Sequence, residues 1–432
     1  MRAAFVKIWG ETAGAISWDP STNVVSFEYD SDFRMKGVEL SPLKMPATGQ
    51  VIYSFPELGT TRAESLSTFK GLPGMLADSL PDRYGSELLK LWLAQRGRPE
   101  NSMNPVETLC FIGKRGMGAL EFEPANSKYR NEAFDIDVEE LTAIAAHLLK
   151  QKSSFLTNLE GDKKQAVLDV FHVGTSAGGA RPKSVIAFNE NTGQVKSGQT
   201  DAPEGFEHWL LKFDGIDQHA LGPTKGYGRV EMAYYNMASA CGIDMMPSRL
   251  LYENDRAHFM TKRFDREGAT QKHHVQTLCA MSHMDYNQTR SFSYEQLFQV
   301  MRELRLPFSC AQQMFRRMVF NVLARNCDDH TKNFAFRIKE NGRWELAPAY
   351  DICFSYSPQN EWVKDHALSV NRKRINIGKQ DLIAVAKSIG YKRPVDTIDQ
   401  IYETISQWSK YADQVKISPA HRDRIQAALP RW

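Results

Sequence analysis

One short polar stretch, residues 326–333, constrains the fold of this chain more than any other feature. It reads Asn-Cys-Asp-Asp-His-Thr-Lys-Asn, so carboxylates, an imidazole, an ammonium and amides follow one another closely. The apolar run 318–324 comes directly before it and predicts the end of a buried helix. A further acid, Asp351, follows the strand-like run 344–346. We therefore expect a buried helix that ends in a charged loop, then a short strand pair and a second acid.

The spacing within this stretch has a chemical use. In protein kinases an aspartate of the catalytic loop lies five residues before an asparagine; the aspartate takes the proton of the attacking hydroxyl, and the asparagine holds Mg²⁺. Asp328 and Asn333 have this spacing, and Asp351 has the place of the acid that binds the metal bridging the phosphates. Asp-x4-Asn alone also fits a solvated loop, because both residue types are common in loops. The combination with the helix, the strand pair and the second acid favours phosphoryl transfer.

Length and composition set broad limits. The 432 residues are 42% hydrophobic and 24% charged, which is typical of a globular protein of two or three domains. The net charge of +3 is near neutral, so composition alone does not indicate a nucleic-acid binder. The six cysteines include no Cys-x-x-Cys pair, which argues against a zinc site or a redox pair. No apolar stretch approaches the roughly eighteen residues of a membrane span, and the N-terminal apolar run is too short for a signal peptide, so a cytoplasmic protein is expected.

The pattern of elements changes along the chain. Strand-like runs and turns dominate the first half, for example 5–9 and 24–29 with a turn at 19–23. The glycines and prolines of residues 69–85 predict a packed loop with a structural role. Residues 113–120 predict a Gly-rich hairpin, since they lack the Gly-Lys-Ser/Thr ending of a phosphate loop. The second half is helical, and its predicted helices are 293–304, 310–324, 379–389 and 395–411.

A second stretch that carries chemistry is residues 173–187. A run of small residues is followed by Arg181 and Lys183 and then by an apolar strand. Glycine and alanine let backbone N–H groups approach an anion closely, and the two cations supply charge. The stretch suits a lid over nucleotide phosphates. It lacks the Gly-x-Gly-x-x-Gly pattern, so a flexible hairpin stays open as the alternative.

Two further strands are candidates for nucleotide contact. Lys212 lies at the end of the strand-like run 208–213, and a buried lysine is costly unless it is paired. A phosphate partner accounts for it, and a lysine that reaches solvent is the alternative. The run 258–262, which leads into the polar turn 263–266, could offer backbone groups to an adenine ring or be a plain edge strand. The triplet 421–423 spells His-Arg-Asp but has no asparagine five residues after its aspartate.

Several segments together resemble the signature motifs of the HipA family, the serine/threonine-protein kinase toxins of bacterial toxin–antitoxin pairs. They follow the family order along nearly the whole chain and are 69–85, 176–183, 262–266, 326–334 and 347–352. The resemblance implies an α+β, protein-kinase-like fold with a strand-rich N-terminal half and an all-helical C-terminal lobe. The implied domains are a HipA-type N-terminal α/β domain (1–125), a kinase N-lobe (126–265) and a helical C-lobe (266–432).

The resemblance also implies roles for single residues. Asp328 becomes the catalytic base, His330 a contact of the transferred phosphoryl group, and Asn333 and Asp351 the Mg²⁺ ligands. The residues implied to bind ATP lie in the Gly-rich loop, on the neighbouring strand or in the hinge, and they are Ser176, Ala177, Gly178, Gly179, Ala180, Arg181, Lys183, Lys212, Lys262, Phe264 and Asp265. Ser176 is where the family autophosphorylates and so silences itself, with Thr175 beside it as the other candidate hydroxyl.

The family further implies cofactors and partners. ATP and Mg²⁺ are expected, together with a HipB-like helix-turn-helix antitoxin dimer that brings operator DNA to the complex. The expected substrate is a protein of translation, glutamyl-tRNA synthetase being the known example, whose phosphorylation arrests growth. Two alternatives remain at this point: a non-catalytic co-repressor, and a small-molecule kinase on the same fold. The motif departs from ordinary kinases at residues 326–327 and 351–353, in ways that look typical of the family.

Overall fold

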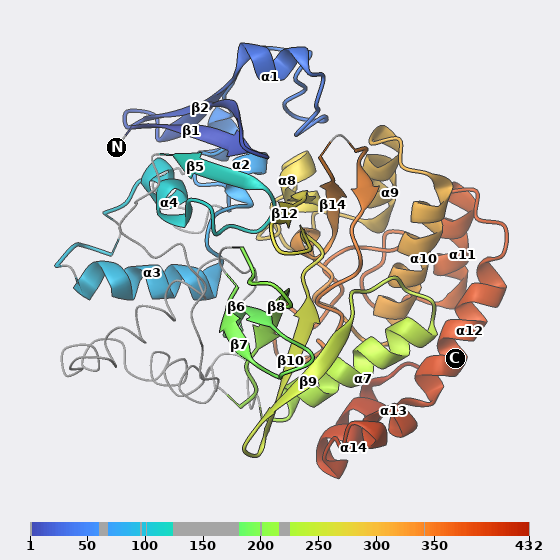
Figure 1. Ribbon diagram of the computed structural model, residues 1–432. Coiled ribbons are helices and arrows are strands. Elements are labelled where there is room, and N and C mark those ends of the chain that lie inside the picture. Colours follow the sequence, from blue (N-terminus) through green and yellow to red (C-terminus); the bar gives the residue numbers. More distant parts are fainter. Residues whose placement is uncertain are drawn as a thin grey trace. The chain divides into compact units, whose positions relative to one another are not determined.

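The computed structural model describes residues 2–59, 68–95, 97–100, 102–123, 181–198, 201–215, 225–340 and 342–431 (Figure 1). The chain divides into two compact units. Unit 1 comprises Met1–Lys225, Arg249–Val275 and Lys339–Asn341, and unit 2 comprises Gly226–Ser248, Gln276–Ile338 and Gly342–Trp432. The predicted boundaries of three domains stay a prediction.

An antiparallel sheet forms the N-terminal part of unit 1, with the order β4-β3-β2-β1-β5. In β1 the residues Ala4, Val6 and Ile8 are buried and alternate with more exposed ones, as in a strand with one face on a core. The sequence did not reveal β2, which is rich in Ala, Gly and Ser and is stabilised by a partner strand on each side. The strands are β1 (Ala3–Ile8), β2 (Glu11–Asp19), β3 (Val24–Tyr29), β4 (Ile52–Tyr53) and β5 (Leu120–Glu123).

Residues 69–85 form a packed segment, as predicted, and they include a short helix. Gly71 has a φ of +77°, and its carbonyl oxygen accepts a hydrogen bond from the N–H of Val25 at 2.8 Å. A Cβ at this position lies 2.1 Å from Asn23 O, so only glycine fits. The helical elements of this part are α1 (Ser31–Met35), η1 (Pro56–Leu58), α2 (Gly74–Ala77), α3 (Arg83–Gln95) and α4 (Pro105–Ile112).

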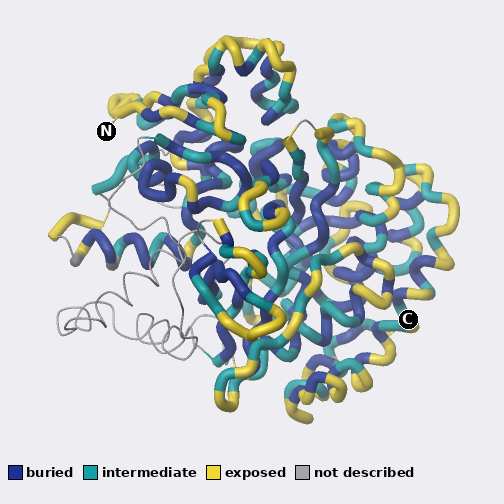
Figure 2. Tube along the Cα trace, in the orientation of Figure 1, coloured by how far each residue is buried: buried dark blue, intermediate teal, exposed yellow. Residues whose placement is uncertain are grey.

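A second sheet of unit 1 has the order β7-β6-β8-β10-β9. Every residue of β6 is buried, and Figure 2 colours such residues dark blue. Residues 113–119 join α4 to β5 instead of linking two paired strands, so the predicted hairpin there is wrong. The remaining strands of unit 1 are β6 (Lys183–Phe188), β7 (Val195–Ser197), β8 (Glu207–Lys212), β9 (Ser248–Glu253), β10 (Arg256–Lys262), β11 (Arg266–Glu267) and β12 (Gln271–Lys272).

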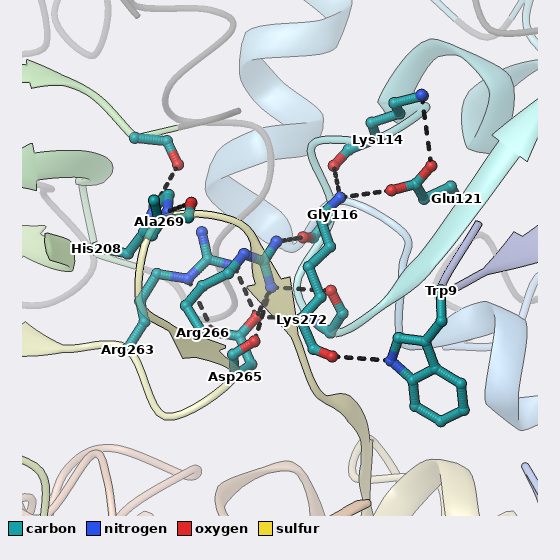
Figure 3. A network of polar contacts seen from close by, with 12 residues as sticks. Trp9, Lys114, Gly116, Glu121, His208, Arg263, Asp265, Arg266, Ala269 and Lys272 are labelled. Atoms are coloured by element: carbon teal, nitrogen blue, oxygen red, sulfur yellow. Dashed lines mark hydrogen bonds and ion pairs between the residues drawn. The ribbon is translucent and has the colours of Figure 1, made fainter. Parts of the chain in front are cut away.

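A buried ionic cluster joins the α4–β5 connection to the end of β10, and Figure 3 shows it. Asp265 is fully buried and accepts hydrogen bonds from Arg263 at 2.8 and 2.7 Å, from Arg266 at 2.7 Å and from the N–H of Gly118 at 2.7 Å. Arg266 also donates to the carbonyls of Gly118 and Gly116. Burial opposes ionisation, but the charges of Arg263 and Arg266 hold the pKa of Asp265 well below its usual value.

Unit 2 is mainly helical, as predicted. Its core includes Tyr234 of α7, which donates to the carbonyl of Ala324 at 2.7 Å and packs edge-on against Trp408. The predicted helix 395–411 is instead two helices, which separate at Gln407. The helices are α7 (Tyr227–Ala240), α8 (Leu278–Ser282), α9 (Tyr294–Glu303), α10 (Phe308–Leu323), η3 (Thr331–Asn333), α11 (Lys379–Ser388), α12 (Pro394–Ser406), α13 (Trp408–Gln414) and α14 (Pro419–Ala428).

Two short strands of unit 2, β14 (Ala335–Ile338) and β15 (Glu345–Leu346), pair antiparallel and form the predicted hairpin before Asp351. The strand β13 (His274–Thr277) leads from unit 1 into unit 2. Helix α9 begins with a capping box in which Ser293 and Gln296 satisfy each other's backbone N–H groups. Within the described residues, no helix is both long and apolar enough to cross a membrane.

The cluster around Asp265 gives a first prediction. Asp265→Ala leaves two arginines buried without their carboxylate, so the free energy of unfolding should fall by about 3–5 kcal/mol. Glu11→Ala is the control, because the Glu11 carboxylate pairs with Lys36 at the surface and an exposed pair contributes under about 1 kcal/mol. Urea unfolding followed by circular dichroism measures both, and equal losses contradict the assignment.

Candidate active site

The charged loop 326–333 follows α10 directly, as predicted. Helix α10 ends at Leu323, and Arg325 turns the chain with a φ of +53°. The loop then lies beside residue 355, since the N–H of Cys327 donates to Ser355 O and the N–H of Ser355 donates to Arg325 O, both at 3.0 Å. Backbone hydrogen bonds on both sides therefore fix where the loop begins.

The two residues with kinase spacing are held together by the loop itself. The side-chain amide of Asn333 donates to the backbone carbonyl of Asp328 at 2.7 Å. The Asp328 side chain is 45% exposed, and its carboxylate lies 3.7 Å from His330 Nε2. The His330 ring in turn packs near Tyr286, with 5.2 Å between ring centroids. The predicted base is thus open to solvent and next to the predicted phosphoryl contact.

Asp351 lies in the same part of unit 2 as Asn333. Its φ of +52° is uncommon for a residue with a side chain and costs backbone energy. The chain before it is fixed by the N–H of Ala349, which donates to Asp244 O at 2.8 Å. Asp351 and Asn333 line one small cavity, whose other lining residues are Arg317, Asn321, Asn326, Asp329, Phe334, Ala349, Tyr350 and Ile352.

The donor groups around this cavity fit a magnesium ion. Mg²⁺ prefers carboxylate and amide oxygens and keeps several of its waters. Because the Asn333 amide nitrogen donates to Asp328 O, the oxygen of the same amide is the atom that could bind a cation. The side-chain oxygen of Asn326 is buried and has no hydrogen-bond partner within the described part of the chain. Such an acceptor can hold a water of a hydrated ion. The sequence did not reveal Asn326 as part of this site.

A second feature that the sequence did not reveal is the environment of Asp329, which is 1% exposed. Its Oδ2 accepts hydrogen bonds from the Tyr294 hydroxyl at 2.8 Å and from His366 Nδ1 at 3.0 Å. Its Oδ1 accepts from the N–H of Ala367 at 2.7 Å. Both oxygens are therefore satisfied by donors of the protein, and the acid is a structural member of the loop.

The Tyr294 hydroxyl continues this network toward Asp351. It accepts a hydrogen bond from the Asn321 amide at 3.0 Å, and Asn321 accepts one from the Asn326 amide at 3.0 Å. The Asn326 amide nitrogen also approaches Asp351 O at 3.5 Å. A signal for Asn321 was present, because it is the one amide within the apolar run 318–324. Nothing near His366 in the sequence points to its role.

The predicted nucleotide residues of unit 1 lie on the second sheet. Lys212 of β8 is in register with Lys183 of β6 and Phe259 of β10, and its ammonium lies 5.8 Å from the Phe259 ring centroid. Lys183 is 2% exposed, and its ammonium lies 3.4 Å from the Asp82 carboxylate. Asp82, from residues 69–85, therefore balances the charge of Lys183 in this structure, which the sequence did not indicate.

The predicted hinge follows directly along β10. Lys262 is in register with Trp209 of β8, and its ammonium pairs with Glu207. The Asp265 carboxylate is enclosed by Arg263, Arg266 and Gly118 as described above, and Asp265 O accepts a hydrogen bond from the N–H of His273 at 3.0 Å, so the carboxylate is not available to a nucleotide. Arg181 is partly buried, and the loop residues Ser176, Ala177, Gly178, Gly179 and Ala180 lie outside the described residues, as does Thr175.

Comparison with known families decides where the chain belongs. The sequence profile of the HipA N-terminal domain matches residues 4–123, and that of the HipA-like C-terminal domain matches residues 175–410. The chain belongs to the HipA family. The predicted family and the predicted α+β fold, with strands in the first half and helices in the second, are thereby confirmed. No curated protein sequence matches the chain.

Two solved structures are similar to this chain. HipA of Shewanella oneidensis MR-1, solved with HipB and its operator DNA, superimposes with a TM-score of 0.67 at 18% identity, and the match covers 98% of this chain and 96% of that one. The Helicobacter pylori proinflammatory kinase CtkA matches with a TM-score of 0.33 at 13% identity, over 52% of this chain and 89% of that one. The likeness to the Shewanella protein shows the fold.

The pair Asp329–His366 predicts a specific dependence of stability on pH. Burial alone lowers the pKa of His366, but the Asp329 charge outweighs this and raises it to about 10 from an ordinary 6.5. Protonated His366 therefore stabilises the fold fully below about pH 6.5, and this contribution declines as the pH rises to 10. The stability difference between wild type and His366→Gln should shrink by about 1 kcal/mol for each pH unit in this window.

Urea unfolding at several pH values measures this difference. His274→Gln is the matched control, because burial lowers the pKa of His274 to about 4 and leaves the ring neutral above pH 6.5. Its stability difference from wild type should stay constant between pH 6.5 and 10. A constant difference for His366→Gln as well rules out a protonated His366 in the folded protein.

Proposed function

We propose that this protein is an ATP- and Mg²⁺-dependent serine/threonine-protein kinase, the toxin of a HipBA-like toxin–antitoxin pair. The observation that carries the proposal is that Asn333 binds the backbone of Asp328 and shares a cavity with Asp351. Residues that are separate in the sequence thus meet with kinase spacing at one place in unit 2. Membership in the HipA family supports the same activity.

In this proposal each of these residues has a role. Asp328, whose carboxylate is half exposed, takes the proton of a substrate hydroxyl as the oxygen attacks the γ-phosphorus of ATP. The bond from that phosphorus to the bridging oxygen breaks, and ADP leaves with the electron pair. Asn333 and Asp351 would hold Mg²⁺, which when bound would supply positive charge to offset the negative charge on the phosphate oxygens. His330, beside Asp328, contacts the transferred group.

The residues of unit 1 supply the nucleotide contacts in this proposal. Lys212 meets the phosphates, and the backbone of Lys262 and Phe264 meets adenine, with Arg181, Lys183 and the loop 176–180 over the phosphates. For Lys183 this requires the ammonium to serve both Asp82 and a phosphate, because the pair with Asp82 is buried. The substrate is a protein of translation, with glutamyl-tRNA synthetase as the first candidate.

Repression of its own operon is the second part of the proposal. The similar Shewanella protein was solved with HipB and operator DNA, which favours a complex of this chain with a helix-turn-helix antitoxin dimer. The net charge of +3 agrees with DNA contact that is made mostly by the antitoxin. A catalytically dead variant should therefore still repress together with its antitoxin.

Variants of the acids test the catalytic proposal. Asp328→Asn should lower ³²P transfer from ATP to protein by about 10²–10⁴-fold while ATP still binds, because only the base is lost. Asp351→Asn should abolish both the transfer and the Mg²⁺-dependent gain in mant-ATP affinity. Asp399→Asn is the control, since Asp399 lies in α12 and pairs with Lys379 at the surface. Its transfer rate should equal that of wild type.

The outcomes separate the alternatives. Undiminished transfer in Asp328→Asn contradicts the proposed base. No ATP turnover by the wild type, with full repression, identifies a non-catalytic co-repressor. Turnover of ATP without any labelled protein in a lysate identifies a small-molecule kinase on the same fold. Growth arrest that persists in both acid variants removes the enzymatic explanation of toxicity.

Autophosphorylation of the Gly-rich loop is a further part of the proposal. A phosphate on Ser176 adds about −1.5 to −2 charge near Arg181 and Lys183 in the sequence, and it should abolish ATP binding. Intact-mass measurement after incubation with ATP should show one added phosphate on wild type and on Thr175→Ala, and none on Ser176→Ala. Wild-type ATP affinity in purified phospho-Ser176 protein contradicts this silencing.

A further inference from the structure

The residue after the proposed base is the most densely bonded acid of the loop. Asp329 receives hydrogen bonds from two separate parts of unit 2, namely Tyr294 of α9 and the adjacent residues His366 and Ala367. His366 and Ala367 lie after Asp351 in the chain, and the His366 side chain is 2% exposed. The carboxylate therefore ties the loop both to a helix and to the segment that follows the proposed metal ligand.

The hydrogen bonds of Asp329 also restrain the neighbouring Asp328, because of the backbone geometry of the loop. The backbone is extended at His330 (φ −82°, ψ 168°), residues 327–329 lie outside helices and turns, and extended backbone directs successive side chains to opposite sides. Burial follows this alternation: Cys327 and Asp329 are buried, whereas Asp328 and His330 are partly exposed. When Asp329 is anchored inward, Asp328 is turned outward, where a substrate hydroxyl can reach it. Ala367 strengthens this geometry, since its N–H also approaches Cys327 O at 3.2 Å.

The same network reaches the proposed metal ligand. The Tyr294 hydroxyl accepts from Asn321, and Asn321 accepts from Asn326, whose amide nitrogen lies 3.5 Å from Asp351 O. All of these partners except Asp351 are buried. In a buried chain of hydrogen bonds, loss of one member leaves its partners without their hydrogen bonds, at a high cost in free energy. One polar network thus spans the distance between the base and the metal site.

We infer that Asp329 is a positioning residue for phosphoryl transfer: bonded to Tyr294, His366 and Ala367, it holds the loop 326–333 so that Asp328 points to the substrate. Asp329 is not a metal ligand in this scheme, because both of its oxygens already accept hydrogen bonds from the protein. The inference rests on the proposed kinase activity, in which Asp328 is the base. It adds a residue that the kinase spacing of Asp328 and Asn333 does not include.

The test compares Asp329→Asn with wild type by two independent readouts. The kcat for protein phosphorylation, divided by the number of sites that bind mant-ATP, should fall about 10–100-fold, because misplacement of a reacting group by about 1 Å has this effect. The KM for ATP should change less than about twofold. Hydrogen–deuterium exchange of the backbone amides of residues 325–334, measured by mass spectrometry, should become faster.

Two further variants make the result specific. Tyr294→Phe removes one donor with little loss of packing and should change both readouts in the same direction but by less. Asp381→Asn is the matched control, because Asp381 is also a buried acid of unit 2, but it caps α11 and pairs with Lys373. It should leave the corrected kcat and the exchange of residues 325–334 unchanged.

The possible outcomes are distinguishable. An unchanged kcat per nucleotide site, or unchanged exchange of the loop amides in Asp329→Asn, overturns the positioning role even if the protein is a kinase. Equal effects of Asp329→Asn and Asp381→Asn on the loop also overturn it, because they show a general loss of stability. No ATP turnover by the wild type instead removes the proposed function, normal transfer by Asp328→Asn removes the proposed base, and in both cases the exchange measurement still decides whether Asp329 anchors the loop.

Discussion

A buried carboxylate must be surrounded by donors, and in unit 2 this requirement organises the whole candidate site. Burying the charge of Asp329 costs several kcal/mol unless hydrogen bonds and an opposite charge offset it. Tyr294, His366 and Ala367 supply them, from two stretches of the chain that are distant from Asp329 in the sequence. The loop that carries Asp328 is therefore fixed in place, because the neighbouring Asp329 has to keep these hydrogen-bond donors. The direction of the exposed side chain follows from the anchoring of the buried one.

Unit 1 uses the same principle at the predicted hinge. Asp265 is fully buried between Arg263 and Arg266, and the N–H of Gly118 completes its shell (Figure 3). Gly118 belongs to the connection between α4 and β5, so the N-terminal sheet and the end of β10 share one ionic cluster. The peptide groups next to Asp265 are thereby held in place. A segment that has to present its backbone to a ligand benefits from such fixed geometry.

The features of the fold and the site that could be predicted from the sequence are those that depend on residues close together in the chain or on a strong periodicity. The spacing of Asp328 and Asn333 is local, and the structure joins the two by one hydrogen bond. The bounds of α9, α10 and α11 follow from their apolar spacing, and α9 also from its capping box. The break between α12 and α13 was missed, because no proline or glycine marks it.

What the sequence did not reveal depends on contacts between distant segments. His366 and Asp329 are 37 residues apart, and no spacing rule relates them. Lys183 and Asp82 are 101 residues apart. The sequence analysis therefore predicted a phosphate contact for Lys183 and did not predict its buried ion pair with Asp82. The residues of strand β2 have a weak intrinsic preference for the strand conformation, so this strand depends on its neighbours in the sheet. Polar groups of this kind become recognisable only when burial and geometry are known.

The central claim is that Asn333 and Asp351 hold the magnesium ion of an ATP complex. A crystal structure of the protein with Mg²⁺ and a non-hydrolysable ATP analogue tests this most directly. The expected result is an ion about 2.0–2.1 Å from the Asn333 side-chain oxygen and from a carboxylate oxygen of Asp351, with the γ-phosphate beside it. An ordered nucleotide whose ion is bound elsewhere, with Asn333 and Asp351 directed away from it, contradicts the claim.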